Sequence, residues 1–82
     1  MKVKKETLKH EVINKLGAIS KEKSGWKKQL TRVSWNAGEP KYDIRSWNED
    51  YTKMGKGITL TEEELRELKK LIDKEVEFLN EE

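Results

Sequence analysis

The sequence predicts an α+β fold in which four β-strands are followed by one long C-terminal helix. Short segments with strand-like patterns, separated by Gly, Pro and Ser, occupy the chain up to Leu60. From Thr61 onward the apolar residues recur every three or four positions, which is the period of an amphipathic helix. The length of 82 residues is that of a single small domain. We therefore expect residues 1–82 to form one domain, with residues 1–8 as a flexible arm.

Turn residues define the four expected strands. Ser24-Gly25 separates the first strand from the second, and the stretch from Ala37 to Pro40 separates the second from the third. Gly55 and Gly57 flank Lys56 where the fourth strand is expected to begin. The expected bounds are Lys9 to Ser20, Trp26 to Trp35, Lys41 to Trp47 and Gly57 to Leu60.

The third expected strand has the clearest alternation of side chains. Tyr42 and Ile44 share one face, which we expect to point inward. The opposite face, which we expect to meet solvent, holds Lys41, Asp43, Arg45 and Trp47. In the second strand Leu30 and Val33 differ in parity, so we expect a bulge or a strong bend there. The apolar residues of the first strand fall on both parities, so the sequence does not determine its register.

A capping box predicts where the helix begins. The Thr61 hydroxyl is positioned to accept a hydrogen bond from the amide of Glu64, whose carboxylate reaches back to Thr61. We expect the helix to run from Glu62 to about Asn80. Its apolar face is wider than one thin sheet needs, so we expect two copies of the chain to dimerise through their helices. The expected interface residues are Leu68, Leu71, Ile72, Val76, Phe78 and Leu79.

The net charge of +2 hides an uneven distribution of charge along the chain. Residues 1–60 carry 14 basic and 7 acidic side chains, whereas residues 61–82 carry 4 and 9. Five of the six aromatic residues lie in the basic part. The absence of cysteine excludes disulfides, thiolate metal sites and a cysteine nucleophile. Because no apolar stretch is long enough for a signal peptide or a membrane span, we expect a cytoplasmic protein without a membrane partner.

Basic side chains and flat rings on one surface favour binding of single-stranded nucleic acid. Cations neutralise phosphates without reading the sequence, and exposed rings stack on unpaired bases. We therefore predict sequence-tolerant binding of single-stranded DNA, with RNA as a close variant. The candidate contact residues are Trp26, Lys27, Lys28, Arg32, Trp35, Lys41, Arg45, Trp47, Lys53 and Lys56, with Tyr51 nearby.

Three stretches from the second expected strand to the start of the helix are specific enough to suggest a family. Arg32 to Asn36 reads Arg-Val-Ser-Trp-Asn, and Glu39 to Arg45 reads Glu-Pro-Lys-Tyr-Asp-Ile-Arg. Gly55 to Thr61 then reads Gly-Lys-Gly-Ile-Thr-Leu-Thr and leads into the Glu-rich start of the helix. Together they resemble the transcriptional positive cofactor four family, in particular its bacterial YdbC-like branch. The resemblance covers most of the chain and is strongest from Trp26 to Ile72.

This resemblance implies a curved four-stranded antiparallel sheet, helix-mediated homodimers, and single-stranded DNA bound across the ridges of the sheet. It also implies that Arg45 and Lys56 contact phosphates, and that Trp35 and an aromatic residue at the end of the third strand stack on bases. Eukaryotic members carry two successive aromatic residues at that strand end, whereas this chain has Trp47 followed by Asn48.

Two other classes of function compete with nucleic-acid binding. An enzyme would require an acidic cluster or a histidine-based site, but Asp43 shares its strand face with Arg45 and Lys41 and is expected to be a locally paired charge. His10 is the only histidine and is expected at the surface. We therefore expect no catalytic residue, metal, cofactor or small-molecule substrate. A protein interaction module acting through the C-terminal helix is the remaining alternative.

Overall fold

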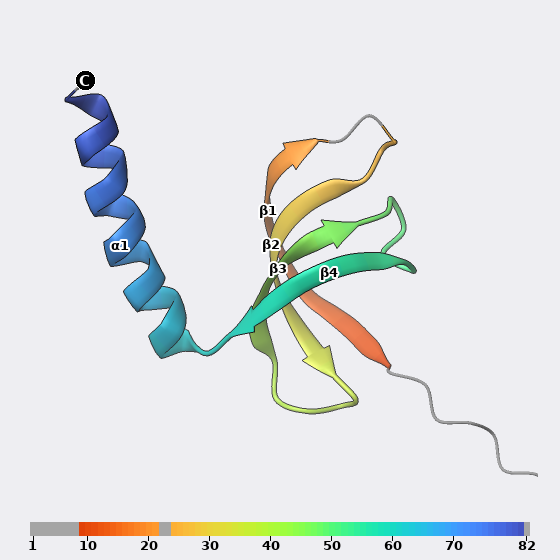
Figure 1. Ribbon diagram of the computed structural model, residues 1–82. Helices are drawn as coiled ribbons and strands as arrows, with labels where there is room; N and C mark the ends of the chain where they lie inside the picture. The colour runs from red at the N-terminus through yellow and green to blue at the C-terminus, as the bar shows by residue number, and fades with distance from the viewer. Residues whose placement is uncertain (1–8, 22–23, 82) are drawn as a thin grey trace, which may run out of the picture.

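One antiparallel sheet and one helix make up the described part of the chain. The computed structural model describes residues 9–21 and 24–81, so the expected arm of residues 1–8 lies outside it. The elements are β1 (His10–Lys21), β2 (Lys27–Trp35), β3 (Lys41–Trp47), β4 (Met54–Leu60) and α1 (Glu62–Asn80). The strands lie in sequence order, which confirms the predicted fold class (Figure 1).

Most element boundaries agree with the sequence prediction. The bounds of β3 and α1 are those expected, and β1 and β2 differ from expectation by a single residue at one or both ends. The exception is β4, which begins three residues early at Met54, because Met54 already pairs with Trp47 across the sheet. Gly55 and Lys56 therefore lie within the strand rather than ahead of it.

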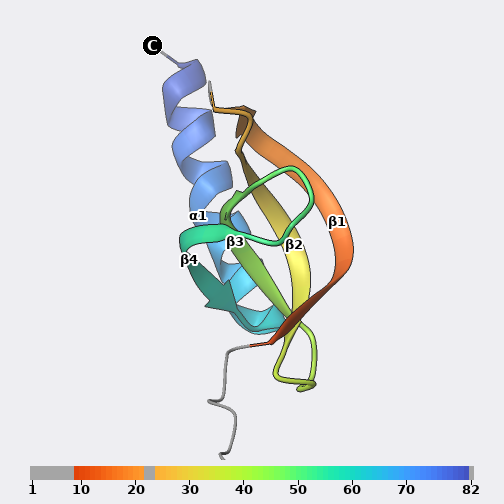
Figure 2. The ribbon, with the colours of Figure 1, turned by 90° about the vertical axis from the view of Figure 1, so that its right-hand side faces the viewer.

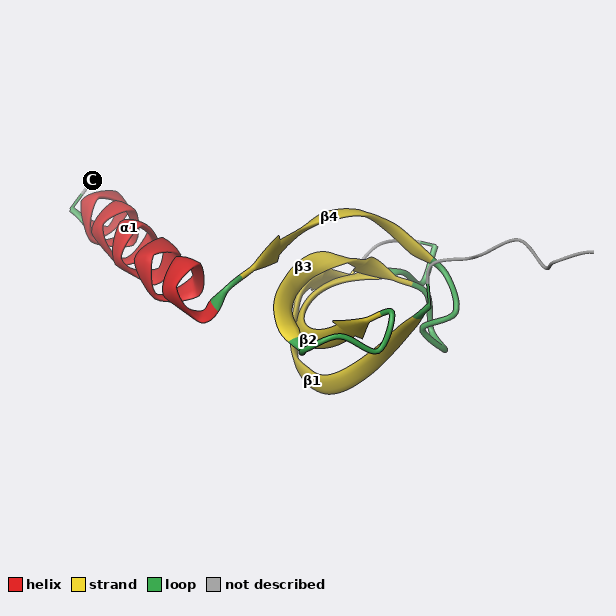
Figure 3. Ribbon diagram, turned by 90° about the horizontal axis from the view of Figure 1, so that it is seen from below, coloured by secondary structure: helices red, strands yellow, loops and turns green. Residues whose placement is uncertain are grey.

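The sheet is strongly curled, and its curvature comes with bulges in β1. The pairing of β1 with β2 shifts three times, and each shift leaves one extra residue in β1. A bulge bends its strand and increases the local twist. Figure 3 shows the resulting curl, with the four strands wrapped around a common interior. The three bulged residues are Ile13, Leu16 and Ile19.

The bulge expected in the second strand is not found, because β2 pairs with β3 in continuous register. Leu30 and Val33 differ in parity for another reason. Val33 points into the curl and is fully buried, whereas Leu30 lies on the outer face beside the helix. Both faces of the sheet therefore need apolar residues.

The inner face of the curl holds the core, which corrects the predicted orientation of β3. Trp47 and Asp43, expected in solvent, are both 0% exposed, whereas Tyr42 and Ile44 lie half-buried on the outer face. The prediction was wrong because it treated charge as a sign of exposure. The carboxylate of Asp43 is paired inside the curl with Arg45, and such pairing permits burial.

The helix α1 begins as predicted but packs only lightly on its own sheet. The capping box is present: Glu64 N–H donates to Thr61 Oγ1 (3.1 Å), and Thr61 N–H donates to Glu64 Oε1 (2.9 Å). The helix projects away from the curl (Figure 1), so it lies behind the sheet in the view of Figure 2, and among the described elements it contacts only β3 and β4. None of its 19 residues is buried. The radius of gyration is 15.8 Å, against about 12 Å expected for a compact chain of this length.

Candidate nucleic-acid interface

Four rings from separate elements meet inside the curl. His10 lies 6.0 Å from Trp35 and 5.1 Å from Trp47, and Trp47 lies 5.7 Å from Tyr51, measured between ring centroids. Trp47 is completely buried, whereas the other three rings are half-buried. Two expectations are therefore corrected: Trp47 is a core residue rather than an exposed indole, and His10 packs between tryptophans instead of lying at the surface.

Tyr51 closes the inner face from the β3–β4 loop. Its backbone has φ of 62°, a left-handed conformation that is uncommon outside glycine. The hydroxyl donates to Gln29 Oε1 (2.7 Å), and the Lys15 ammonium lies 4.3 Å from the ring centroid. The carbonyl oxygen of Tyr51 lies 2.9 Å from His10 Nε2, which must carry a proton because a carbonyl only accepts. These contacts join the loop to β1 and β2.

The same loop is fixed by polar contacts around Asp50. The Thr52 hydroxyl and amide donate to Asp50 Oδ1 at 2.6 and 3.3 Å. Because these donors stabilise the charged carboxylate, they hold the pKa of Asp50 below its ordinary value. Asn48 joins the two ends of the loop by accepting from the Lys53 amide (2.9 Å). The loop that carries Tyr51 is thus shaped by its own side chains.

Arg45 and Asp43 form an ion pair inside the curl. Arg45 Nε donates to Asp43 Oδ2 (2.5 Å), and Arg45 Nη2 donates to Asp43 Oδ1 (2.8 Å). The Thr59 hydroxyl adds a third bond to Asp43 Oδ1 (3.0 Å). The guanidinium carbon lies 4.9 Å from the centroid of the Trp35 ring. The pairing expected from the sequence is therefore present, and the pair lies against an aromatic ring.

Three exposed lysines occupy strand positions that belong to the inner face of the sheet. Lys15 pairs with Thr31 and Lys41 pairs with Val33, and both partners are buried inside the curl. Lys27 occupies the equivalent position opposite Trp47. Sequence reasoning missed Lys15 because the bulges on either side of it make the parity of β1 unreadable. Its register opposite Thr31 is the signal that identifies it.

The remaining predicted contact residues lie elsewhere. Lys28 pairs with Ser46 and Arg32 with Tyr42, which places both on the outer face. Arg32 Nη1 donates to Asn14 Oδ1 (2.7 Å). Of the other residues, Trp26 is half-buried just before β2, Lys53 is exposed just before β4, and Lys56 is exposed within β4. The structure therefore divides the predicted set between two faces and does not gather it on one.

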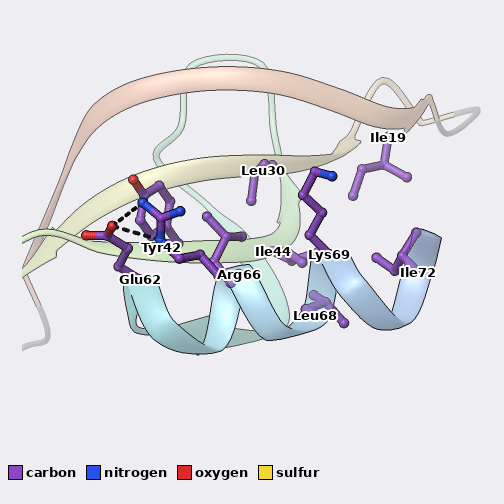
Figure 4. Close-up of a pocket in the computed structure, with 10 residues that line it drawn as sticks. Ile19, Leu30, Tyr42, Ile44, Glu62, Arg66, Leu68, Lys69 and Ile72 are labelled. Atoms are coloured by element: carbon purple, nitrogen blue, oxygen red, sulfur yellow. Dashed lines mark hydrogen bonds and ion pairs between the residues drawn. The ribbon is translucent and has the colours of Figure 1, made fainter. Parts of the chain in front are cut away.

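An apolar groove of about 550 Å³ lies between the outer face and α1. Figure 4 shows Leu30 and Ile44 from the sheet facing Leu68 and Ile72 from the helix. Glu62 and Arg66 form an ion pair at one end (2.7 Å). Leu68 is half-buried, whereas the other expected interface residues are 45–57% exposed: Leu71, Ile72, Val76, Phe78 and Leu79.

Comparison with known proteins identifies relatives of this chain. The model of the family described as Transcriptional Coactivator p15 (PC4) matches residues 21–71. A protein of Treponema pallidum (strain Nichols), described as uncharacterized, is 44% identical over 64 residues, which cover 78% of this chain and 75% of that protein. Among the residues that the structure describes, no helix has the length and hydrophobicity needed to cross a membrane.

Proposed function

The chain belongs to the Transcriptional Coactivator p15 (PC4) family, and on this basis we propose that it binds single-stranded DNA as a homodimer without strong sequence preference. The family comprises nucleic-acid-binding coactivators of transcription, known for binding single-stranded DNA, and not enzymes. We also propose that the protein acts in the cytoplasm, in transcription, replication or repair.

The observation that carries the proposal is the joint presence of rings and lysines on the inner face. Trp35 is half-buried, and we propose that the exposed part of this residue receives an unpaired base. Lys15, Lys27 and Lys41 are exposed in the register of the same face. We propose that these ammonium groups neutralise phosphates while Trp35 stacks on a base. Such contacts tolerate any sequence, because every base has a stacking face.

The loop ends of the sheet extend this surface. Trp26, a second half-buried indole, and the exposed Lys53 lie at the end of the sheet where Lys27 pairs with Trp47, and Lys56 adds exposed charge on β4. Lys28 and Arg32 lie on the outer face, so in this proposal they contribute long-range attraction rather than contacts beside Trp35. Trp47 contributes by supporting the inner face from within the core.

The homodimer is supported by the exposed apolar surface of α1. The helix contacts its own sheet only lightly, and five large apolar side chains of α1 are about half exposed. A second copy would cover these side chains and the adjoining groove, which supplies burial that a small single core lacks. A second copy would also explain why most of the expected interface residues are exposed when one copy is considered by itself.

The proposed function is tested by titrating the protein with oligo-dT and with a duplex of equal length. We expect tryptophan quenching and tight binding for the single strand alone, because a duplex withholds its bases. Replacing Lys15, Lys27 and Lys41 with Gln is expected to reduce the salt slope of oligo-dT binding by about 0.7 for each phosphate that is no longer neutralised. An oligo-U titration in parallel compares RNA with DNA.

The matched control is Lys74→Gln, which removes one exposed lysine from the acidic helix. We expect it to leave affinity and salt slope unchanged. Equal binding of duplex and single strand, or an unchanged slope in the triple variant, would contradict the proposed surface.

A further inference from the structure

Arg45 is held inside the protein from three sides. Its side chain is only 14% exposed, and that of its partner Asp43 is 0% exposed. On β4, the carbonyl oxygen of Gly55 lies 3.4 Å from Arg45 Nη1, and the sulfur of Met54 lies 3.5 Å from the same atom. On β2, the Trp35 ring covers the guanidinium. The planar group is thus fixed by Asp43 on its own strand, by Met54 and Gly55 on β4, and by the indole of Trp35 on β2.

The charge of Arg45 is compensated before any ligand arrives. Its two-point contact with a fully buried carboxylate makes the pair electrically neutral. Moving Arg45 onto a phosphate would leave Asp43 charged and buried, with the hydrogen bond from the Thr59 hydroxyl in place but without its ion-pair partner, which is strongly unfavourable. Binding of a phosphate by an exposed lysine such as Lys41 has no comparable cost, because its ammonium group is already in water and leaves no buried partner behind.

The contact with Trp35 suggests a role for the buried pair of Arg45 and Asp43. Arg45 lies 4.9 Å from the ring centroid, and His10 lies 6.0 Å from it with a tilt of 49°. Guanidinium groups stack well on aromatic faces, and a fixed one restricts how the indole can turn. A ring held in place loses less freedom when a base stacks on it.

We propose that Arg45 and Asp43 are positioning residues: Asp43 fixes Arg45, Arg45 fixes the Trp35 ring for base stacking, and the exposed lysines supply the phosphate contacts. This inference rests on the proposed function, and it differs from the phosphate-contact role for Arg45 that the family resemblance implies.

A double-mutant cycle with Arg45→Gln and Trp35→Ala tests the inference through oligo-dT affinity. We expect Arg45→Gln to lower affinity by about 5- to 150-fold, the range for loss of one base stack, with the salt slope unchanged. In the Trp35→Ala background, the same change is expected to cost less than about 2-fold. The matched control Lys41→Gln lies on the same strand and face, and we expect it to reduce the slope by about 0.7.

Two results would contradict the inference, and they can be told apart. If Arg45→Gln reduces the salt slope as much as Lys41→Gln, and its effect adds to that of Trp35→Ala, Arg45 binds phosphate and the inference is overturned. If the wild-type protein does not bind oligo-dT at all, the proposed function itself fails, and the positioning role fails with it.

A second measurement uses the wild-type chain, so it does not depend on how Arg45→Gln folds. An abasic oligonucleotide presents phosphates without bases. In ¹⁵N NMR spectra, we expect it to shift the side-chain signals of Lys41 but to leave the Arg45 Nε–H signal in place. A shift of Arg45 as large as that of Lys41 would show direct phosphate contact and overturn the inference.

Discussion

Gly57 makes the close approach of β4 to β3 possible at the position of Arg45. The two residues are paired across the strands. A Cβ atom added to Gly57 would overlap the Cβ of Arg45 and the carbonyl oxygen of Ile44. Because these obstacles belong to or adjoin the backbone, they cannot move aside cheaply. Position 57, which pairs with Arg45 of the buried ion pair, therefore requires a residue without a side chain.

We predict that Gly57→Ala lowers the free energy of unfolding by about 1–3 kcal/mol, the usual cost of overpacking. Urea denaturation at fixed protein concentration measures it. The control is Gly55→Ala, where the nearest atom, Ser46 Cβ, lies 3.9 Å from the added methyl. We expect that variant to stay within about 0.5 kcal/mol of wild type. Equal effects at both positions would argue against the steric explanation.

At the scale of elements, the sequence predicted best what depends on local chemistry. The start of α1 followed from the reciprocal bonds of Thr61 and Glu64, and the bounds of β3 followed from strict alternation. The faces of β3 did not follow, because burial of Asp43 depends on its pairing with Arg45 inside a curled sheet. Likewise, the position of Lys15 depends on bulges that alternation alone does not reveal.

The N-cap of α1 gives a prediction at this scale. Thr61→Ala removes the hydroxyl that accepts from Glu64 N–H, so we expect a loss of about 1 kcal/mol in unfolding free energy. For a domain of this size, that corresponds to a decrease in Tm of roughly 4–8 °C. Thr61→Ser keeps the hydroxyl and serves as the control. A decrease of the same size in Thr61→Ser would point to the lost methyl group instead.

At the scale of the whole molecule, α1 extends the chain instead of compacting it. The apolar side of the helix and the outer face of the sheet border a common groove that one copy leaves open. The width of the apolar stripe predicted a dimer interface, and the structure supplies the exposure of those residues. The sequence could not show that the sheet itself would contribute Leu30 and Ile44 to this groove.

For the homodimer, we predict that Ile72→Glu yields a monomer at micromolar concentration, because it places a charge in the apolar groove. Light scattering measures the mass directly. Lys74→Glu is the control, because that residue is two positions further along the helix and points away from Ile72. A monomeric mass for the wild-type chain would refute the dimer.

The bulges of β1 also affect what the sheet can join. Within the described part of the chain, β1 is a long edge strand, and such edges are sites where chains add to one another in aggregates. A foreign strand needs a straight, regularly spaced row of amides and carbonyls to pair with. Extra residues at Ile13, Leu16 and Ile19 interrupt that row three times within 12 residues. The irregularity that curls the sheet therefore also protects its apolar edge from uncontrolled growth.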